Sequence, residues 1–349
     1  MALQKHPIYI RAFFLILTWF WGTVIAIGAL LRFLSSPKKF IFAKNYDCLP
    51  TCAVDSQLGL HQSVTIDTVD CGKLKLKYVC NGTKGKPLML LQHGFPESWY
   101  SWRYQLKEFY DDYWVVALDM RGYGDSDKPQ RLESYALDYL VEDTSAVIHA
   151  LGYEKATVMG HDWGGAITWL FAARYPDMCE KIIILNCPHP SVQRKHFTSS
   201  LKQLLASWYM FYFLLPYLPE VIMRANDFAM LAATLRGKKG GVKNKNKLTK
   251  DDLDVFKYSL NTWESRVASH NYIRANLTYK PKASQGKITP PMLILWGTED
   301  LFLTRQLAVD STRCAESCQL IFLEGVSHWV QQDVPEQVNE HMRDFLTSS

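Results

Sequence analysis

The sequence predicts an α/β fold: a mostly parallel central sheet flanked by helices, with an N-terminal transmembrane helix before it and a helical cap inserted in its second half. Three observations predict this fold. Short apolar runs alternate with segments of helical period, as is typical of strands buried on both faces of a parallel sheet. About a hundred residues without such a run separate Asn186 from Met292. Near the N-terminus, residues 12–31 are uncharged and mostly apolar.

The composition indicates a large globular protein. The chain has 349 residues, of which 48% are hydrophobic and 21% charged, so it can bury a sizeable core. The net charge of +5 is modest, and no lysine- or arginine-rich helix alternates with aromatic residues. Nucleic-acid binding is therefore not expected. The eight cysteines are scattered and lack the spacing of a zinc site.

Residues 12–31 have the length of a helix that crosses a bilayer. A cleaved signal peptide is the alternative, but its apolar region is usually shorter and ends in small residues, whereas Arg32-Phe33-Leu34 follows here. We therefore expect residues 1–34 to form a membrane anchor. Positive charges are more frequent after the span than before it, which favours a cytosolic location for the residues that follow the span, but a long folded domain can override that bias. These charges are Lys5 and Arg11 before, and Arg32, Lys38, Lys39 and Lys44 after.

The sheet is expected to begin with an antiparallel hairpin. Residues 63–69 and 73–80 alternate apolar and polar side chains and are separated by a turn at Asp70-Cys71-Gly72. Buried strands follow at the apolar runs 88–92, 114–119, 156–160 and 181–186, and again at 292–297 and 319–325. We divide the chain into the anchor, a connecting segment (35–59), a first part of the core (60–190), the cap (191–286) and a second part of the core (287–349).

Within the cap, residues 204–219 are strongly apolar but too short, and too soon interrupted by Pro216, to span a membrane. They are expected to pack on the core or to face an apolar substrate. Residues 236–247 form a basic, glycine-containing loop, either a solvated excursion or a contact with anionic lipid. Thr249 and Asp252 have the spacing of a capping box that starts the next helix.

Gly160-His161-Asp162-Trp163-Gly164 has the outline of a nucleophile elbow, G-x-S-x-G, with aspartate in place of serine. The remaining members of a triad follow in the expected order. Asp300 comes just after the apolar run 292–297, and His328 just after the run 319–325. A carboxylate that accepts a hydrogen bond from the imidazole fixes its tautomer, so the other nitrogen can take a proton from water. Glu299 is the local alternative to Asp300.

The aspartate indicates the chemistry. A carboxylate is ionised at neutral pH and attacks without a base; on an sp3 carbon it forms an alkyl ester, which activated water can hydrolyse. A serine would form an ether there, so the aspartate points to an epoxide or an alkyl halide. The backbone N–H groups of Phe95 and Trp163 are expected to form the oxyanion hole. The Phe95–Pro96 bond is a candidate for the cis form.

The chain resembles the epoxide hydrolases of the α/β-hydrolase fold, and in particular the membrane-anchored types 3 and 4. The resemblance covers nearly the whole chain and rests on residues 93–106 (HGFPESWYSWRYQL), 117–129 (ALDMRGYGDSDKP), 160–169 (GHDWGGAITW), 186–190 (NCPHP) and 327–339 (SHWVQQDVPEQVN). It implies that Asp162 is the nucleophile, that Asp300 and His328 activate water, and that two cap tyrosines protonate the epoxide oxygen. Haloalkane dehalogenases share the aspartate elbow but usually carry asparagine where this chain has Phe95.

By this resemblance the first proton donor is Tyr209, with Tyr212 ranked second. The second donor does not transfer directly from the family. The family pattern N-x-Y-R reads Asn271-Tyr272-Ile273-Arg274 here, and ungapped alignment places Ile273 on the tyrosine position. Tyr272 can serve only if the helix shifts by one residue, since helical neighbours point about 100° apart. His93, Pro96, Tyr212 and Trp329 are expected to line the substrate pocket.

The sequence therefore predicts a single-pass membrane protein, in the endoplasmic reticulum by resemblance, that hydrolyses lipophilic epoxides such as those of unsaturated fatty acids to vicinal diols. It is expected to use no metal or organic cofactor and to bind no nucleic acid. A haloalkane dehalogenase and a catalytically silent, membrane-tethered scaffold remain the alternatives.

Overall fold

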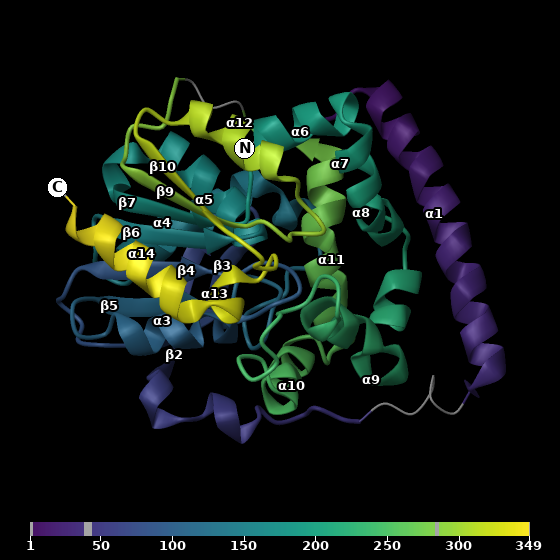
Figure 1. Cartoon of the computed structure of the whole chain (residues 1–349), viewed down its shortest axis with the longest axis horizontal. Helices are drawn as coiled ribbons and strands as arrows, with labels where there is room; N and C mark the ends of the chain where they lie inside the picture. The colour runs from purple at the N-terminus through teal and green to yellow at the C-terminus, as the bar shows by residue number, and fades with distance from the viewer. Residues whose placement is uncertain (1–2, 38–43, 283–285, 349) are drawn as a thin grey trace.

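The computed structural model describes residues 3–37, 44–282 and 286–348, and these residues form a central eight-stranded sheet with helices on both faces (Figure 1). Along the sheet the strands lie in the order β10-β9-β7-β6-β4-β5-β3-β2. Their bounds are β2 (Leu60–Thr68), β3 (Gly72–Asn81), β4 (Leu88–Gln92), β5 (Trp114–Leu118), β6 (Ala156–His161), β7 (Cys179–Leu185), β9 (Met292–Gly297) and β10 (Cys318–Leu323).

The strands pair as the sequence pattern predicts. β2 and β3 form the antiparallel hairpin, β3 pairs antiparallel with β5, and all the other pairs in this sheet are parallel. Strands β4 to β7 and β9 are almost entirely buried, which explains why they read as continuous apolar runs rather than as alternating ones. The predicted fold class is therefore confirmed.

The register of the sheet brings several strand ends together. Gln92 at the end of β4 pairs with Gly160 of β6, so the loop that begins at His93 leaves the sheet beside the turn that carries Asp162. On the other side of β6 and β7, the ends of β9 and β10 are in register at Gly297 and Leu323. The carboxyl ends of the parallel strands lie at the same end of the sheet, which is where binding sites of open α/β sheets form.

Helices cover the two faces of the sheet (Figure 1). Helices α3 (Arg103–Glu108), α13 (Val330–Asp333) and α14 (Pro335–Thr347) contact one another on one face. Helices α4 (Leu137–Ala150) and α5 (Trp163–Arg174) contact each other on the opposite face. Helix α12 (Arg305–Ser311) packs against the first helix of the inserted segment.

The residues between β7 and β9 are mainly helical and lie beyond the edge of the sheet (Figure 1). Helix α10 begins at Thr249 with the predicted capping box: the Thr249 hydroxyl accepts from the Asp252 N–H, and the Asp252 carboxylate accepts from the Thr249 N–H. The elements are α6 (Pro190–Ser199), α7 (Leu201–Ala206), α8 (Trp208–Phe213), α9 (Leu218–Arg236), α10 (Lys250–Ser259), α11 (Trp263–Thr278) and β8 (Tyr279–Lys280).

The basic loop 236–247 packs against the core rather than extending into solvent. The N–H groups of Lys243 and Asn244 donate to the Asp333 carboxylate at 2.7 and 3.2 Å. The indole N–H of Trp329 donates to the Gly240 carbonyl at 3.1 Å. The loop therefore supports the segment that carries His328.

The N-terminal helix α1 (Ile8–Ser35) runs along the outer side of the inserted helices and contacts α8 (Figure 1). Trp21 meets Trp208 with ring centroids 5.4 Å apart, and Phe14 meets Phe211 at 5.6 Å. Gly22 lies so close to α8 that an added Cβ would come within 2.3 Å of Leu215. The helix is therefore packed on the catalytic domain and is not separate from it.

The chain before α1 and the chain well beyond it also contact the rest of the protein. Before the helix, the short strand β1 (Gln4–Lys5) pairs antiparallel with β8. Beyond the helix, Lys44 forms an ion pair of 3.1 Å with Asp254, and its carbonyl accepts from Arg224. Lys38 and Lys39, which entered the charge comparison, lie outside the described residues.

The outward face of α1 is apolar. It is 28 residues long, so it measures about 42 Å and is long enough to cross the hydrocarbon core of a bilayer. Many of its large apolar side chains are exposed, among them Ile8, Ile16, Trp19, Leu31 and Leu34. The described residues thus carry one candidate membrane helix, close to the N-terminus.

Candidate active site

Asp162 sits on a sharp turn between β6 and α5. Its backbone has φ 50° and ψ −117°, a region that L-residues rarely occupy and that costs about 1–3 kcal/mol. The turn needs glycines around it, because a Cβ on Gly160 would lie 2.3 Å from the Gly164 carbonyl oxygen and one on Gly164 would lie 2.1 Å from that of Gln92. The strained turn pushes the carboxylate out at the edge of the sheet.

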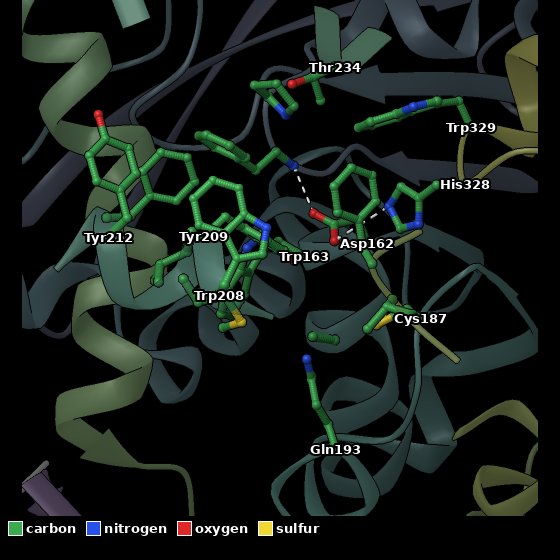
Figure 2. A pocket seen from close by; sticks show the side chains of 18 of the residues that line it. Asp162, Trp163, Cys187, Gln193, Trp208, Tyr209, Tyr212, Thr234, His328 and Trp329 are labelled. Carbon is green, nitrogen blue, oxygen red and sulfur yellow. Dashed lines mark hydrogen bonds and ion pairs between the residues drawn. The ribbon is translucent and has the colours of Figure 1, made fainter. Parts of the chain in front are cut away.

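The two oxygens of Asp162 have different surroundings (Figure 2). Oδ1 accepts a hydrogen bond of 2.9 Å from the backbone N–H of Phe95. Oδ2 lies 3.7 Å from Nε2 of His328. Gly94 permits this approach, since a Cβ there would lie 2.4 Å from the Cβ of Asp162. Trp163 starts α5, so its N–H has no acceptor within the helix.

His328 lies between two carboxylates. Its Nδ1–H donates to Oδ2 of Asp300 at 2.5 Å, which directs Nε2 toward Asp162. Asp300 is fixed in turn by the N–H groups of Phe302 and Leu303, at 2.7 and 3.0 Å. The alternative residue, Glu299, is exposed and pairs with Lys243 instead.

Burial and neighbouring charges shift the pKa values of His328 and Asp162. Burial alone would lower the pKa of His328, but the charges of Asp300 and Asp162 and their hydrogen bonds raise it to about 10. Burial alone would raise the pKa of Asp162, but the hydrogen bond and charge of His328, with the Phe95 N–H, hold it below its usual value. At neutral pH an imidazolium therefore lies between two carboxylates.

A mostly apolar cavity of about 180 Å³ opens above Asp162, and we call it the catalytic cavity. Asp162 and His328 are part of its wall, and Tyr209, Pro96 and Trp329 line it as well. No lysine or arginine is among the described residues that line it. Its other lining residues include Phe95, Trp163, Tyr212, Phe213, Ile273 and Phe302.

Tyr209 and Tyr212 both come from α8 and line this cavity, but they differ. Burial, together with the charges of Asp162 and Asp300, raises the pKa of Tyr209 well above its usual value, so its hydroxyl stays protonated. The Tyr212 hydroxyl is buried, has no hydrogen-bond partner among the described residues, and points away from Asp162 (Figure 2). Tyr209 is thus the better placed of the two.

Tyr272 is not where a second proton donor would have to be. Its side chain is buried outside the catalytic cavity, and its hydroxyl donates to the backbone carbonyl of Arg121 at 2.8 Å. Its helical neighbour Ile273 lines the cavity instead. The expected one-residue shift of α11 does not occur, because the Arg121 contact and packing against Tyr123 and Tyr135 hold Tyr272 on the other side of the helix.

His93 also differs from the expectation, because it does not line the cavity. Its Nδ1–H donates to the Gly94 carbonyl at 2.9 Å, and its Nε2 accepts from the N–H of Met120 at 3.1 Å. Burial lowers the pKa of His93 to about 4, so the ring is neutral and can form both bonds. It shapes the loop that presents Phe95, and the Phe95–Pro96 bond in that loop is cis.

Two supporting groups were not predicted. Asn186, at the end of β7, donates to Asp300 at 2.7 Å and accepts from the Gly297 N–H at 2.9 Å, so it ties Asp300 to the end of β9. His161 donates from Nε2 to the His328 carbonyl at 3.0 Å, and its Nδ1 is hydrogen-bonded with Glu97 at 2.7 Å. His161 and Asn186 lie in the sequence motifs 160–169 and 186–190, but their hydrogen-bond partners are distant in sequence and are seen only in the structure.

Within the described ranges, no group of three or more His, Cys, Asp or Glu side chains is placed to hold a metal ion.

Comparisons with known proteins agree with this geometry. A family profile described as the alpha/beta hydrolase fold matches residues 87–333. Epoxide hydrolase 1 of Caenorhabditis elegans is 45% identical over 275 residues, which cover 78% of this chain and 68% of that protein. Epoxide hydrolase 4 of Homo sapiens is 41% identical over 299 residues, which cover 85% of this chain and 82% of that protein.

Solved structures are similar as well. An epoxide hydrolase from Bacillus megaterium, in complex with an inhibitor, superposes with a TM-score of 0.73 at 32% identity and covers 82% of this chain and 100% of its own. Fold and elbow thus define an enzyme of the α/β-hydrolase class. Within that class, the chain belongs to the epoxide hydrolase family.

Proposed function

We propose that this protein converts lipophilic epoxides to vicinal diols through an alkyl-enzyme ester on Asp162. The observation that carries the proposal is that the two oxygens of Asp162 have different partners. Oδ1 is held by the Phe95 N–H, while Oδ2 faces both the apolar cavity and His328. Membership of the epoxide hydrolase family supports the same reaction.

In the first step an oxygen of Asp162 attacks one epoxide carbon, and the bond between that carbon and the epoxide oxygen breaks. The electron pair goes to that oxygen, which takes the proton of the Tyr209 hydroxyl. Tyrosine suits this role because it remains protonated until attack creates a stronger base. With Tyr272 directed to Arg121, Tyr209 acts alone.

Loss of the Asp162 charge weakens the hold of His328 on its proton, and His328 gives that proton to the Tyr209 phenolate formed in the first step. In the second step the neutral imidazole takes a proton from water at Nε2, and the resulting hydroxide attacks the carbonyl carbon of the ester. Negative charge develops on the carbonyl oxygen, where the Phe95 N–H, assisted by the Trp163 N–H, stabilises it. The ester bond to the alkyl oxygen breaks, the alkyl oxygen takes the proton that His328 received from water, and the diol leaves. The oxygen that Asp162 lost to the diol is replaced from water.

The lipophilic substrate class is inferred from the cavity wall, which is lined mainly by aromatic and aliphatic side chains. Helix α1 supports membrane attachment, because large apolar side chains on its outward face are exposed to solvent. We further propose that residues 191–286 act as the cap that supplies Tyr209 to the core. Their last segment includes residues outside the described ranges.

The reaction is tested by mass spectrometry with the full chain purified in detergent. Wild type is incubated with a lipophilic epoxide beside Asp162→Ala, and diol from wild type alone is expected. With His328→Gln the ester should accumulate, so the intact protein gains the whole mass of the epoxide. A single turnover of wild type in H218O should place the heavy oxygen in the peptide that contains Asp162 and not in the diol.

Three results would contradict the proposal. Heavy oxygen found directly in the diol of the single turnover would mean that water attacks the epoxide without an ester. Release of halide from haloalkanes, with no diol from any epoxide, would favour the dehalogenase reading. If a folded wild-type protein turns over neither class of substrate, the silent scaffold is favoured.

A further inference from the structure

A second apolar cavity, of about 280 Å³, lies between α1 and the catalytic domain, and we call it the anchor cavity. One wall comes from the N-terminal end of α1 and from His6, two residues before the helix. The helix contributes Tyr9, Phe13 and Phe14, among others. The opposite wall comes from α5, α6, α8 and α11. Its other lining residues include Leu137, Pro190, Arg194, Phe197, Leu277 and Pro281.

The anchor cavity adjoins the catalytic cavity. Trp163, Ala166, Gln193 and Met210 line both of them. Trp163 and Ala166 belong to the first turn of α5, directly after Asp162. The two cavities therefore meet at these four side chains, close to Asp162 on one side and to α1 on the other.

Arg194 is the only lysine or arginine among the described residues that line the anchor cavity, and none of them is acidic. Its side chain is partly buried, and no hydrogen bond or ion pair joins it to any described residue. A partly exposed cation beside an apolar cavity, without an acidic partner, can form a charge-assisted hydrogen bond with an anion. Burial lowers the pKa of Arg194, with no acid to oppose the effect.

His6 does not add a second positive charge to this cavity, which leaves Arg194 as the cation that an anion would meet among the described lining residues. His6 lies on the same cavity, and burial, with the charges of Arg194 and Lys280, lowers its pKa. The catalytic cavity, by contrast, contains the Asp162 carboxylate and no lysine or arginine among its described lining residues. The His328 imidazolium of the catalytic cavity is already paired with Asp162 and Asp300, whereas Arg194 has no acidic partner among the described residues, so an anionic group is favoured at Arg194.

We propose that Arg194 binds the carboxylate of an acyl-chain epoxide, whose chain runs from the anchor cavity into the catalytic cavity. This inference rests on the proposed function for the identity of the reactive group, but not for binding of the carboxylate. It assigns a specificity role to Arg194 and makes α1 part of the substrate site.

The test is a binding measurement that needs no turnover. Full-length protein in detergent, at mildly alkaline pH, is titrated with oleic acid or methyl oleate, which share the apolar chain and differ in charge. For Arg194→Gln we expect the Kd for oleate to rise about tenfold, which is about 1.4 kcal/mol, while the Kd for methyl oleate stays within about twofold. Arg194→Lys should keep most of the oleate affinity, because the charge remains.

Lys202→Gln is the matched control, because Lys202 is an exposed cation of the neighbouring helix α7 and lines neither cavity. It should leave both Kd values unchanged. Unchanged oleate binding by Arg194→Gln, or an equal loss for acid and ester, would overturn the inference. Turnover of an epoxidised oleate is followed separately: if wild type forms no diol, the proposed function fails, while the oleate titrations still decide the role of Arg194.

Discussion

The pH dependence of the second step is a sharp test of the arrangement around His328. In the free enzyme the imidazole faces the charged carboxylates of Asp300 and Asp162, and its pKa is raised to about 10. Formation of the alkyl ester removes the charge of Asp162. At an effective dielectric constant of about 20, two unit charges 3.7 Å apart interact by about 4 kcal/mol.

That loss of interaction energy lowers the midpoint of the His328 titration by about three pH units, since about 1.4 kcal/mol corresponds to one unit. The direction favours catalysis: the ester itself converts His328 from a protonated partner of Asp162 into a base that works near neutral pH. Because hydrolysis needs the neutral imidazole, its rate should rise with pH, with a midpoint near neutrality. Alkylation needs ionised Asp162 and protonated Tyr209, so its rate should stay nearly constant over the same range.

The two rates can be separated by single-turnover stopped-flow measurements with a slowly hydrolysed epoxide, with the fluorescence of Trp163 beside the nucleophile as the signal. The range from about pH 5 to about pH 9 covers the expected midpoint. A hydrolysis rate that is flat across this range, or one whose midpoint stays as high as in the free enzyme, would refute the reasoning. His328→Gln supplies the control, because it should alkylate without hydrolysing.

Three further predictions follow from single contacts. Tyr209→Phe should slow alkylation by about 10²-fold or more in single turnovers, whereas Tyr212→Phe should change it by less than about threefold; equal effects would contradict the assignment. Asn186→Ala removes a donor to Asp300 and leaves a buried N–H unpaired, so the free energy of unfolding should fall by about 1–3 kcal/mol in urea titrations, with hydrolysis slowed more than alkylation. Gly22→Leu should separate α1 from α8 and increase hydrogen exchange at residues 208–215; unchanged exchange would argue against the packing.

The sheet was predictable because its strands are buried on both faces. The apolar runs 88–92 and 292–297 coincide with β4 and β9, since a strand hidden from water on both sides has no polar alternation to obscure it. The positions of Asp162, Asp300 and His328 could be predicted for a related reason, because residues that directly follow parallel strands of one sheet lie at the same end of that sheet. The structure places all three in contact.

Helical positions were harder to predict. A strand end fixes where a residue lies, but on a helix each step along the chain turns the side chain by about 100°, so sequence spacing leaves the facing residue open. Tyr272 illustrates this, because its orientation is decided by the carbonyl of Arg121, which is 151 residues away. Asn186 and Arg194 were not predicted for the same reason. The role of Asn186 depends on its hydrogen bonds to Asp300 and Gly297, and that of Arg194 depends on the apolar cavity beside it, and neither set of neighbours is close in sequence.

The packing of α1 along the inserted helices has a practical consequence for handling the enzyme. Removing residues 1–35 to obtain a water-soluble form would strip the covering from Trp208, Phe211 and Leu215 and expose an apolar strip on the outside of the domain. Such a shortened chain should aggregate. In the intact protein α1 therefore serves as part of the outer wall of the domain and keeps these aromatic side chains away from water.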